Sequence, residues 1–224
     1  MKRTTFFAAL FAAFTLAALP FSASAQSQEE LENLSYALGV LFGNNLMQQG
    51  IDGVDAASLA QGLTDKMNGT PSMSPEEANA LVTEIMTSKK EAADAEYRAL
   101  CESFLAENAK KSGISITDSG LQYRHETVGS GESPTAESTV EVHYRGTLID
   151  GTEFDSSYKR GETISFPLNG VIPGWTEGLQ LMKAGGKTTF WIPQALAYGA
   201  RPNPNGPIPP YAALIFEVEL ISIQ

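Results

Sequence analysis

The residues best suited to bind another molecule are a few aromatic side chains and one carboxylate. They are Tyr144, Phe154, Asp155, Trp175 and Tyr198. Tyr144 and Asp155 belong to a predicted hairpin, because the pair Asp150-Gly151 lies between two β-prone runs. Brought together, these side chains would form an apolar pocket with a single charge. Such a pocket suits an apolar ring and supplies no nucleophile, redox group or metal ligand set.

Composition excludes several classes of function. The net charge of −11 comes from an excess of acidic residues in both halves of the chain after residue 25, without basic clusters, which disfavours nucleic-acid binding. The two histidines and one cysteine show no metal-site spacing, so no metal or cofactor is expected. Because Cys101 is the one cysteine of the sequence, no disulfide can form within the chain. This cysteine is either a buried apolar thiol or a link between two chains of a dimer.

The first 25 residues have the pattern of a secretory signal. Lys2 and Arg3 precede an apolar run from Phe6 to Pro20, and Ala23-Ser24-Ala25 is a small-residue cleavage site. The apolar run is too short to span a bilayer comfortably. We therefore expect an exported chain that starts at Gln26 and has no membrane span after cleavage; an uncleaved anchor is the alternative.

Residues 26–112 are predicted to be helical. Apolar residues recur every three or four positions on one face of the first helix: Leu31, Leu34, Leu38, Leu41, Phe42 and Leu46. Asp55 is the predicted N-cap of a second helix that ends at Asn68-Gly69. Ser74-Pro75-Glu76-Glu77 predicts the start of a third helix through a capping box.

The third helix meets no breaker before Gly113, so it should span roughly 50 Å. The two short helices before it are too small to cover its apolar stripe. The simplest cover is a second copy of the chain, which makes residues 26–112 a predicted dimerisation domain. The alternative is a compact three-helix domain with a solvated long helix.

From residue 113 to the end the hydrophobic pattern changes to period two. The predicted strands are Leu121–Val128, Val140–Ile149, Thr152–Asp155, Thr163–Pro167, Lys187–Ile192 and Ala213–Ile223, and one short helix is expected at about Gly174–Met182. In the last strand Ser222 falls out of pattern, on the apolar face. The expected class is α+β, an antiparallel sheet around a short helix preceded by an all-α domain.

Residues from about Gly120 onward resemble the FKBP-type peptidyl-prolyl cis-trans isomerases. The matching segments are Val142–Gly146, Gly151–Ser157, Val171–Trp175, Ala197–Gly199, Ile208–Pro210 and Leu214–Leu220. The helical half, with Tyr36–Gly39 and Gln49–Asp52, is similar to the dimerising N-terminal domain of the Mip-like and periplasmic members. The resemblance implies cis/trans isomerisation of X-Pro bonds in exported proteins, by a non-covalent mechanism.

It also implies a role for each pocket residue. Asp155, Tyr198, Trp175 and Phe154 correspond to catalytic positions, and Tyr144, Val171, Ile172, Phe216, Ile164 and Ile208 to substrate-binding positions. Trp175 would be the floor under the proline ring. The hydroxyl of Tyr198 and the backbone N–H of Ile172 would donate to substrate carbonyls. Asp155 would either orient Tyr144 or face the rotating carbonyl carbon.

The match departs from the family pattern in places. Ile164 stands where an aromatic residue is frequent, so a wider pocket is expected there. Arg160 is a candidate partner of Asp155. The segment 201–210, called the flap below, is rich in proline and carries Pro207 where a branched apolar residue is frequent. These changes bear on substrate preference and on the binding of macrolide inhibitors, which the resemblance allows.

A second function stays open from the sequence alone. The dimeric helical half would form a cleft for unfolded proline-containing clients, making the chain a periplasmic chaperone with incidental isomerase activity. The set of pocket residues favours the isomerase, and both functions are compatible. The expected location is the periplasm, with the outer membrane or cell surface as alternatives.

Overall fold

The computed structural model describes residues 27–51 and 53–224. The expected signal peptide lies outside the described residues. The chain divides into two compact units, residues 1–86 and residues 87–224, and each is described by itself. None of the described helices has the length and apolarity needed to cross a membrane.

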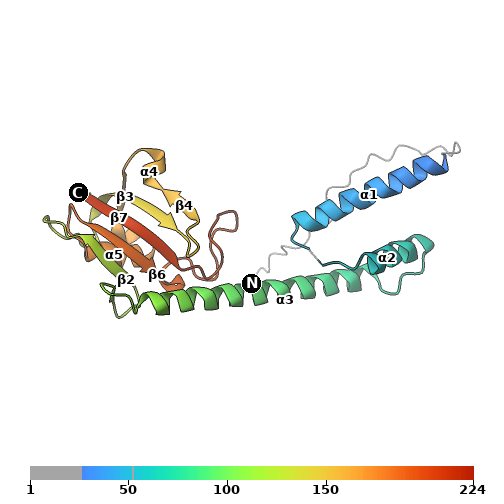
Figure 1. Ribbon diagram of the computed structural model, residues 1–224, viewed down its shortest axis with the longest axis horizontal. Coiled ribbons are helices and arrows are strands. Elements are labelled where there is room, and N and C mark those ends of the chain that lie inside the picture. Colours follow the sequence, from blue (N-terminus) through green and yellow to red (C-terminus); the bar gives the residue numbers. More distant parts are fainter. Residues whose placement is uncertain (1–26, 52) are drawn as a thin grey trace. The chain divides into compact units, whose positions relative to one another are not determined.

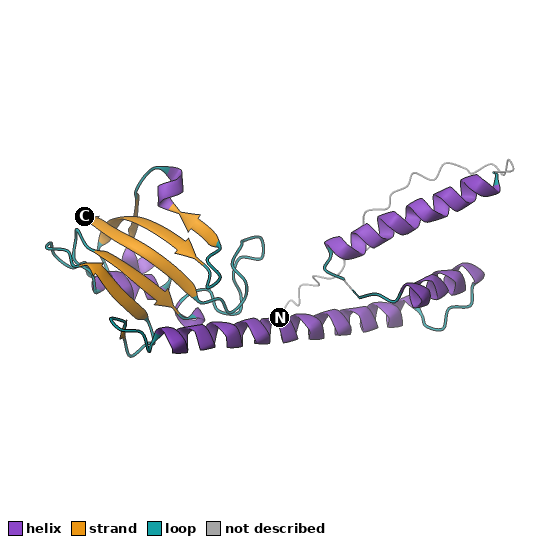
Figure 2. Ribbon diagram, in the orientation of Figure 1, coloured by secondary structure: helices purple, strands orange, loops and turns teal. Residues whose placement is uncertain are grey.

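The first unit is helical, as predicted (Figure 2). It holds α1 (Gln28–Gln48), α2 (Ala56–Asn68) and the start of α3 (Pro75–Asn108). Asp55 caps α2 by accepting a hydrogen bond from the backbone N–H of residue 58, at 2.7 Å, and Gly69 ends the helix in a left-handed conformation. Local capping chemistry therefore sets these boundaries.

No described residue between positions 27 and 86 is buried within the single chain. The predicted apolar face of α1 stays open, with Leu34 and Leu38 each 45% exposed and Leu41 56% exposed. Leu81 and Ile85 on α3 are 46% and 48% exposed. The described residues of this unit consequently form no hydrophobic core within one chain.

Helix α3 starts where the sequence predicted and ends earlier. Its capping box is complete, because the N–H of Glu77 donates to Ser74 Oγ and the N–H of Ser74 donates to the Glu77 carboxylate. The helix ends at Asn108, not at Gly113. Gln122 Nε2 donates to the carbonyl of Leu105, and Asn108 Nδ2 donates to Gln122 Oε1, both at 2.9 Å. Contacts to a distant strand thus satisfy the last turn.

The second unit is built on an antiparallel sheet with strand order β1-β2-β6-β7-β3-β4 (Figure 1). Strand β5 pairs with β3, on the same edge as β4 but toward the other end of β3. The strands are β1 (Ser115–Ile116), β2 (Gln122–Thr127), β3 (Thr139–Thr147), β4 (Glu153–Ser156), β5 (Ile164–Pro167), β6 (Lys187–Ile192) and β7 (Leu214–Ile223). The six predicted strands are present, and β1 is an addition.

Short helices connect and cover these strands. They are α4 (Ser157–Arg160), α5 (Pro173–Gln180) and the 3-10 turns η1 (Leu168–Gly170) and η2 (Gln194–Leu196). Helix α5 is the predicted short helix. It buries Trp175 and Leu179 against the inward side chains of the sheet, among them Phe190 and Phe216. This α+β core positions the pocket described below.

The predicted hairpin joins β3 to β4. Between the strands the N–H of Leu148 donates to the carbonyl of Thr152 at 2.9 Å, and this hydrogen bond encloses a turn of three residues, 149–151. Gly151 has φ +86, a conformation that other residues adopt only under strain. The Asp150 carboxylate also accepts from the N–H of Thr152 at 2.9 Å. The Asp-Gly pair thereby sets the turn.

One expectation for β7 is wrong. Ser222 does not lie on the apolar face, since its hydroxyl donates to the outward-facing carboxylate of Glu141 at 2.9 Å. A register shift pairs Glu141 with Ser222 but Val142 with Leu220, which leaves residue 221 as an extra residue. This bulge reverses the alternation, and Ile223 packs against the core.

Candidate active site

A pocket of about 790 Å³ lies in the second unit, lined by residues of the sheet, α5 and the flap. All ten residues that the sequence suggested for the site line it: Tyr144, Phe154, Asp155, Ile164, Val171, Ile172, Trp175, Tyr198, Ile208 and Phe216. They come from β3, β4, β5, α5, β7, the two residues just before α5, the flap and the loop that precedes it. The fold therefore brings these ten residues together in one cavity.

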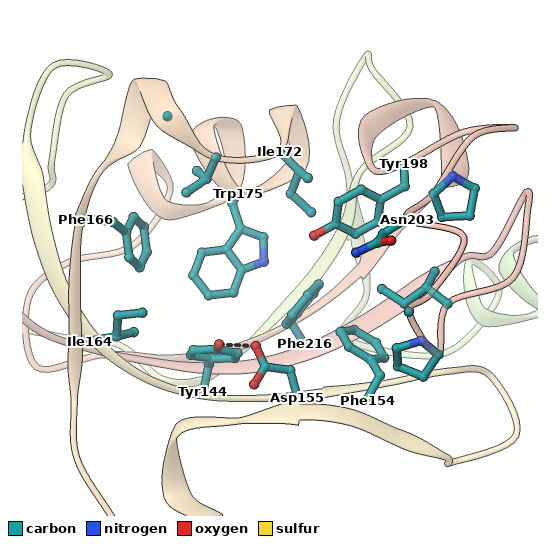
Figure 3. Close-up of a pocket in the computed structure, with 16 residues that line it drawn as sticks. Tyr144, Phe154, Asp155, Ile164, Phe166, Ile172, Trp175, Tyr198, Asn203 and Phe216 are labelled. Atoms are coloured by element: carbon teal, nitrogen blue, oxygen red, sulfur yellow. Dashed lines mark hydrogen bonds between the residues drawn. The ribbon is translucent and has the colours of Figure 1, made fainter. Parts of the chain in front are cut away.

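Trp175 forms the floor of the pocket. Its indole is 6% exposed and meets the ring of Tyr144 edge-on, with centroids 5.1 Å apart, and the ring of Phe216 at 5.0 Å. Figure 3 shows the indole of Trp175 with the rings of Phe166, Tyr144 and Phe216 around it. The indole Nε1 is buried without a hydrogen-bond partner among the described residues. The ring is therefore held by packing alone.

The aromatic wall depends on the close approach of a glycine in β3. A Cβ built on Gly146 would lie 2.7 Å from Phe154 and 2.8 Å from Phe216, closer than real contacts allow. These two phenyl rings meet edge-to-face at 5.4 Å over that position. The missing side chain is thus what lets the wall form.

Asp155 is held on both of its oxygens. Tyr144 donates its hydroxyl to one oxygen, and Arg160 forms an ion pair with the other. Arg160 also donates to the Tyr144 hydroxyl at 2.9 Å and lies over the Tyr144 ring, 5.5 Å from its centroid. The suggested pairing of Arg160 with Asp155 is present. The three side chains form one polar edge on an otherwise apolar cavity.

This arrangement keeps Asp155 ionised. Partial burial pushes the pKa of the carboxyl up, but the hydrogen bonds from Tyr144 and Arg160, with the charge of Arg160, outweigh it and leave the pKa lowered. Burial and the hydrogen bond to Asp155 raise the pKa of the Tyr144 hydroxyl. The tyrosine remains a donor and the aspartate an acceptor at neutral pH.

Tyr198 faces this edge from the other side of the pocket. Its hydroxyl points into the cavity, beside the side-chain amide of Asn203 (Figure 3). Neither the hydroxyl of Tyr198 nor the backbone N–H of Ile172 has a hydrogen-bond partner within the described part of the chain. Ile172 is the N-cap of α5, where free N–H groups are expected. Two donors are therefore available to a ligand.

Comparison with known proteins agrees with this geometry. Residues 130–221 match the family model described as FKBP-type peptidyl-prolyl cis-trans isomerase, and residues 31–124 match the domain amino terminal to it. The FKBP-type peptidyl-prolyl cis-trans isomerase FkpA of Aeromonas hydrophila is 43% identical over 89% of this chain and 79% of its own length. The chain belongs to the FKBP-type peptidyl-prolyl cis-trans isomerases.

Other relatives extend the similarity to both halves of this isomerase. The FKBP-type 22 kDa peptidyl-prolyl cis-trans isomerase of Escherichia coli is 42% identical over 84% of this chain and 93% of its own length. The outer membrane protein MIP of Legionella longbeachae is 40% identical, covering 86% and 85%. The crystal structure of FkpA from Escherichia coli superposes with a TM-score of 0.74 at 37% identity, covering 88% of this chain and 96% of that one.

The sequence reasoning missed pocket residues of this isomerase on β5 and the flap. Phe166 lines the pocket with its ring 5.3 Å from that of Trp175. It pairs with Val140 while Ile164 pairs with Val142, which puts both side chains on the core face. Because residues two apart in a strand lie on the same face, the sequence position of Phe166 relative to Ile164 already indicated that both face the core. Asn203 was within the recognised flap, but its direction depends on the fold of that loop.

The described residues contain no group of three or more His, Cys, Asp and Glu arranged to hold a metal ion. Cys101 is buried, 2% exposed, and its thiol accepts a hydrogen bond from the N–H of Ala213 at 3.4 Å. The apolar-thiol alternative therefore describes it in this structure. A link between chains would need the thiol at the surface.

Proposed function

We propose that the isomerase works by binding proline in the aromatic pocket and stabilising the twisted amide. The barrier of about 20 kcal/mol comes from amide resonance, and the twisted amide has lost that resonance and much of its carbonyl polarity. A pocket with apolar walls and little water favours the less polar form. The supporting observation is the buried Trp175 floor, ringed by Tyr144, Phe166 and Phe216.

In this proposal the polar groups orient the substrate and move no proton. The proline ring lies on Trp175 between Phe154, Val171 and Phe216, with Ile164 and Ile208 at its margins. The Tyr198 hydroxyl and the Ile172 N–H donate to carbonyls flanking the proline. Asp155 keeps Tyr144 in place and provides negative charge at the pocket edge. It is not a general base, because its oxygens are occupied by Tyr144 and Arg160.

The two tryptophans of the chain allow a matched test. Trp175→Phe should lower the rate of cis/trans exchange in a short X-Pro peptide, followed by NMR exchange spectroscopy. Trp191→Phe should leave it unchanged, since Trp191 lies outside the pocket lining, beneath the guanidinium of Arg124. Equal cis/trans exchange rates in the two variants would contradict the proposed role of Trp175 as the pocket floor.

We further propose that residues 26–112 dimerise and that residues 113–224 are the catalytic domain. The support is the first unit, where no described residue between 27 and 86 is buried in one chain. A helical unit with an open apolar face needs a partner, and a second copy is the simplest. Such a dimer would also hold unfolded proline-containing clients, which adds a chaperone function to isomerisation.

The chaperone function can be separated from catalysis. Trp175→Phe should keep the suppression of aggregation of a reduced, unfolded protein while losing peptide exchange. If Trp175→Phe lost both peptide exchange and the suppression of aggregation, the pocket and not the helical half would bind the unfolded clients. Added macrolide inhibitor should compete for the pocket and slow exchange without changing the suppression of aggregation.

Export is proposed from the sequence of residues 1–25, which we take as a cleaved signal peptide directing the chain to the periplasm. Fractionation of cells expressing the full chain, with N-terminal sequencing, tests this. A mature protein starting at Gln26 in the periplasmic fraction is expected. Recovery with outer membranes or at the cell surface would replace the periplasmic assignment.

A further inference from the structure

Tyr211, just past the flap, has an unusual backbone conformation. Its φ is +62, and it is the one non-glycine residue with positive φ in the described part of the chain. A bulky side chain rarely adopts this left-handed conformation, which costs free energy and persists only where surrounding contacts hold it. The contacts that hold Tyr211 therefore show what the conformation achieves.

One contact to Tyr211 comes from helix α3, and a second contact from the same helix reaches Ala213, two residues further on. The guanidinium of Arg98 lies over the Tyr211 ring, 5.6 Å from its centroid, and is itself held by Glu102 at 2.8 Å. One turn along the helix, the buried thiol of Cys101 accepts the N–H of Ala213 at 3.4 Å. The helix thus holds the chain at two successive points beyond the flap. All these residues belong to the second unit.

The third contact closes the base of the flap. The N–H of Tyr211 donates to the carbonyl of Gly199 at 2.8 Å, which ties the chain after the flap to the chain before it. Gly199 directly follows Tyr198, whose hydroxyl points into the pocket (Figure 3). Ile208 lies within the closed loop and lines the same pocket. The residue with the left-handed backbone is thus the one whose N–H closes the flap.

We propose that Tyr211 is a positioning residue and that α3, through Arg98 and Cys101, sets the placement of Tyr198 over the pocket. The helix that continues into the N-terminal unit would then be part of the catalytic apparatus. This inference rests on the proposed role of Tyr198 as a donor to substrate. It adds that the donor is positioned by residues outside the pocket.

The test uses the full chain and peptide exchange as the readout. Arg98→Ala should lower kcat/KM about two- to fivefold, the range expected for losing one exposed cation–ring contact. Tyr211→Phe keeps the ring and should preserve the rate, whereas Tyr211→Ala should lower it. Lys90→Ala is the matched control, because it removes a similar i,i+4 ion pair with Asp94 from the same helix and should change nothing.

The thiol contact is tested separately. Cys101→Ala removes the acceptor of the Ala213 N–H, and Cys101→Ser keeps one. Amide hydrogen exchange should become faster at Tyr211 and Ala213 in Arg98→Ala and Cys101→Ala, and less so in Cys101→Ser. This readout needs no catalysis, so it reports on the contacts of Arg98 and Cys101 with the chain after the flap even if the assigned role of Tyr198 fails.

A double-mutant cycle decides whether the helix acts through Tyr198. If it does, Arg98→Ala should cost much less in a Tyr198→Phe background than alone. Additive losses would overturn the inference while leaving the role of Tyr198 intact. No loss in Tyr198→Phe itself would reject the donor role instead. Unchanged amide hydrogen exchange and unchanged kcat/KM in Arg98→Ala and Cys101→Ala would reject the proposal that α3 positions Tyr198.

Discussion

The hydroxyl of Tyr144 donates a hydrogen bond to the carboxylate of Asp155 across the β3–β4 hairpin. Arg160 holds the other carboxylate oxygen and donates to the same hydroxyl. Each polar group at this edge of the pocket therefore limits the freedom of the other two. The carboxylate acts as a fixed charge that orients a ring wall, which suits a reaction without proton transfer.

Replacing Asp155 should lower the isomerase rate while leaving the fold intact. Asp155→Ala removes a charged acceptor that holds Tyr144, a contribution of about 1.5–3 kcal/mol, so kcat/KM should fall by roughly 10- to 100-fold. Glu153→Gln on the same strand is the control, since Glu153 pairs with Arg145 and Lys159 and does not line the pocket. A full rate in Asp155→Ala, measured by peptide exchange, would show that this edge is dispensable.

Activity should depend little on pH between about 5 and 9. The pKa of Asp155 is lowered below its ordinary value of 3.8 and that of Tyr144 is raised above 10.0, so neither changes charge in this window. Neither histidine of the chain lines the pocket. A profile of kcat/KM with an inflection near neutral pH would argue for a titrating catalytic group.

Stability should respond to acid in a defined direction. Because folding lowers the pKa of Asp155, its contribution to the free energy of unfolding is fully present above the unfolded pKa near 3.8. It is lost as pH falls through the lower folded value. Glu153, whose pKa is lowered by its hydrogen bonds to Lys159 and Arg145, adds in the same sense. Urea unfolding at stepped pH should show less acid sensitivity in Asp155→Asn than in the parent.

Gly146→Ala should damage both stability and activity. The new methyl group would meet Phe154 at 2.7 Å and Phe216 at 2.8 Å, and such overpacking costs about 1–3 kcal/mol. Gly170→Ala is a suitable comparison, because its methyl group would meet only Pro167, at 3.6 Å. Denaturant unfolding of both variants measures the difference. Equal midpoints would mean that the aromatic wall shifts without cost.

Phe166 should matter more for substrate affinity than Ile164. Its ring packs against Trp175 at 5.3 Å, whereas Ile164 is 37% exposed at the pocket margin. Phe166→Ala should therefore raise KM several-fold, and Ile164→Ala much less, by the loss of buried aromatic area. Titration of an X-Pro peptide against each variant gives the comparison, and a reversed order would shift the binding surface toward the margin.

The N-terminal unit should hold two chains together through the apolar face of α1. Leu38→Glu places a charge in that face, and the mature chain should shift from dimer to monomer in analytical ultracentrifugation. Asn33→Glu, one position before Leu34 and off the stripe, should leave the mass unchanged. A parent chain that is already monomeric at micromolar concentration would contradict the dimer.

The sequence alone determined the features that depend on near neighbours. Helix starts at Asp55 and Ser74 could be placed because capping is local, and the hairpin turn because Gly151 accepts a positive φ. The strand segments could be predicted from the alternation of apolar and polar residues along the chain. The residues of the pocket were predicted from the resemblance to a family, because several motifs in the right order identify a site more specifically than any single residue does.

Tertiary structure decided what depends on partners far along the chain. Helix α3 ends at Asn108, where Gln122 donates to the carbonyl of Leu105 and accepts from the Asn108 side chain. Ser222 turns outward because a bulge against β3 shifts the register. The ring of Tyr211, a residue with positive φ, lies under the guanidinium of Arg98, more than a hundred residues earlier. Sequence patterns record burial and turn chemistry but not which distant groups satisfy a hydrogen bond, and those contacts form only when the sheet assembles.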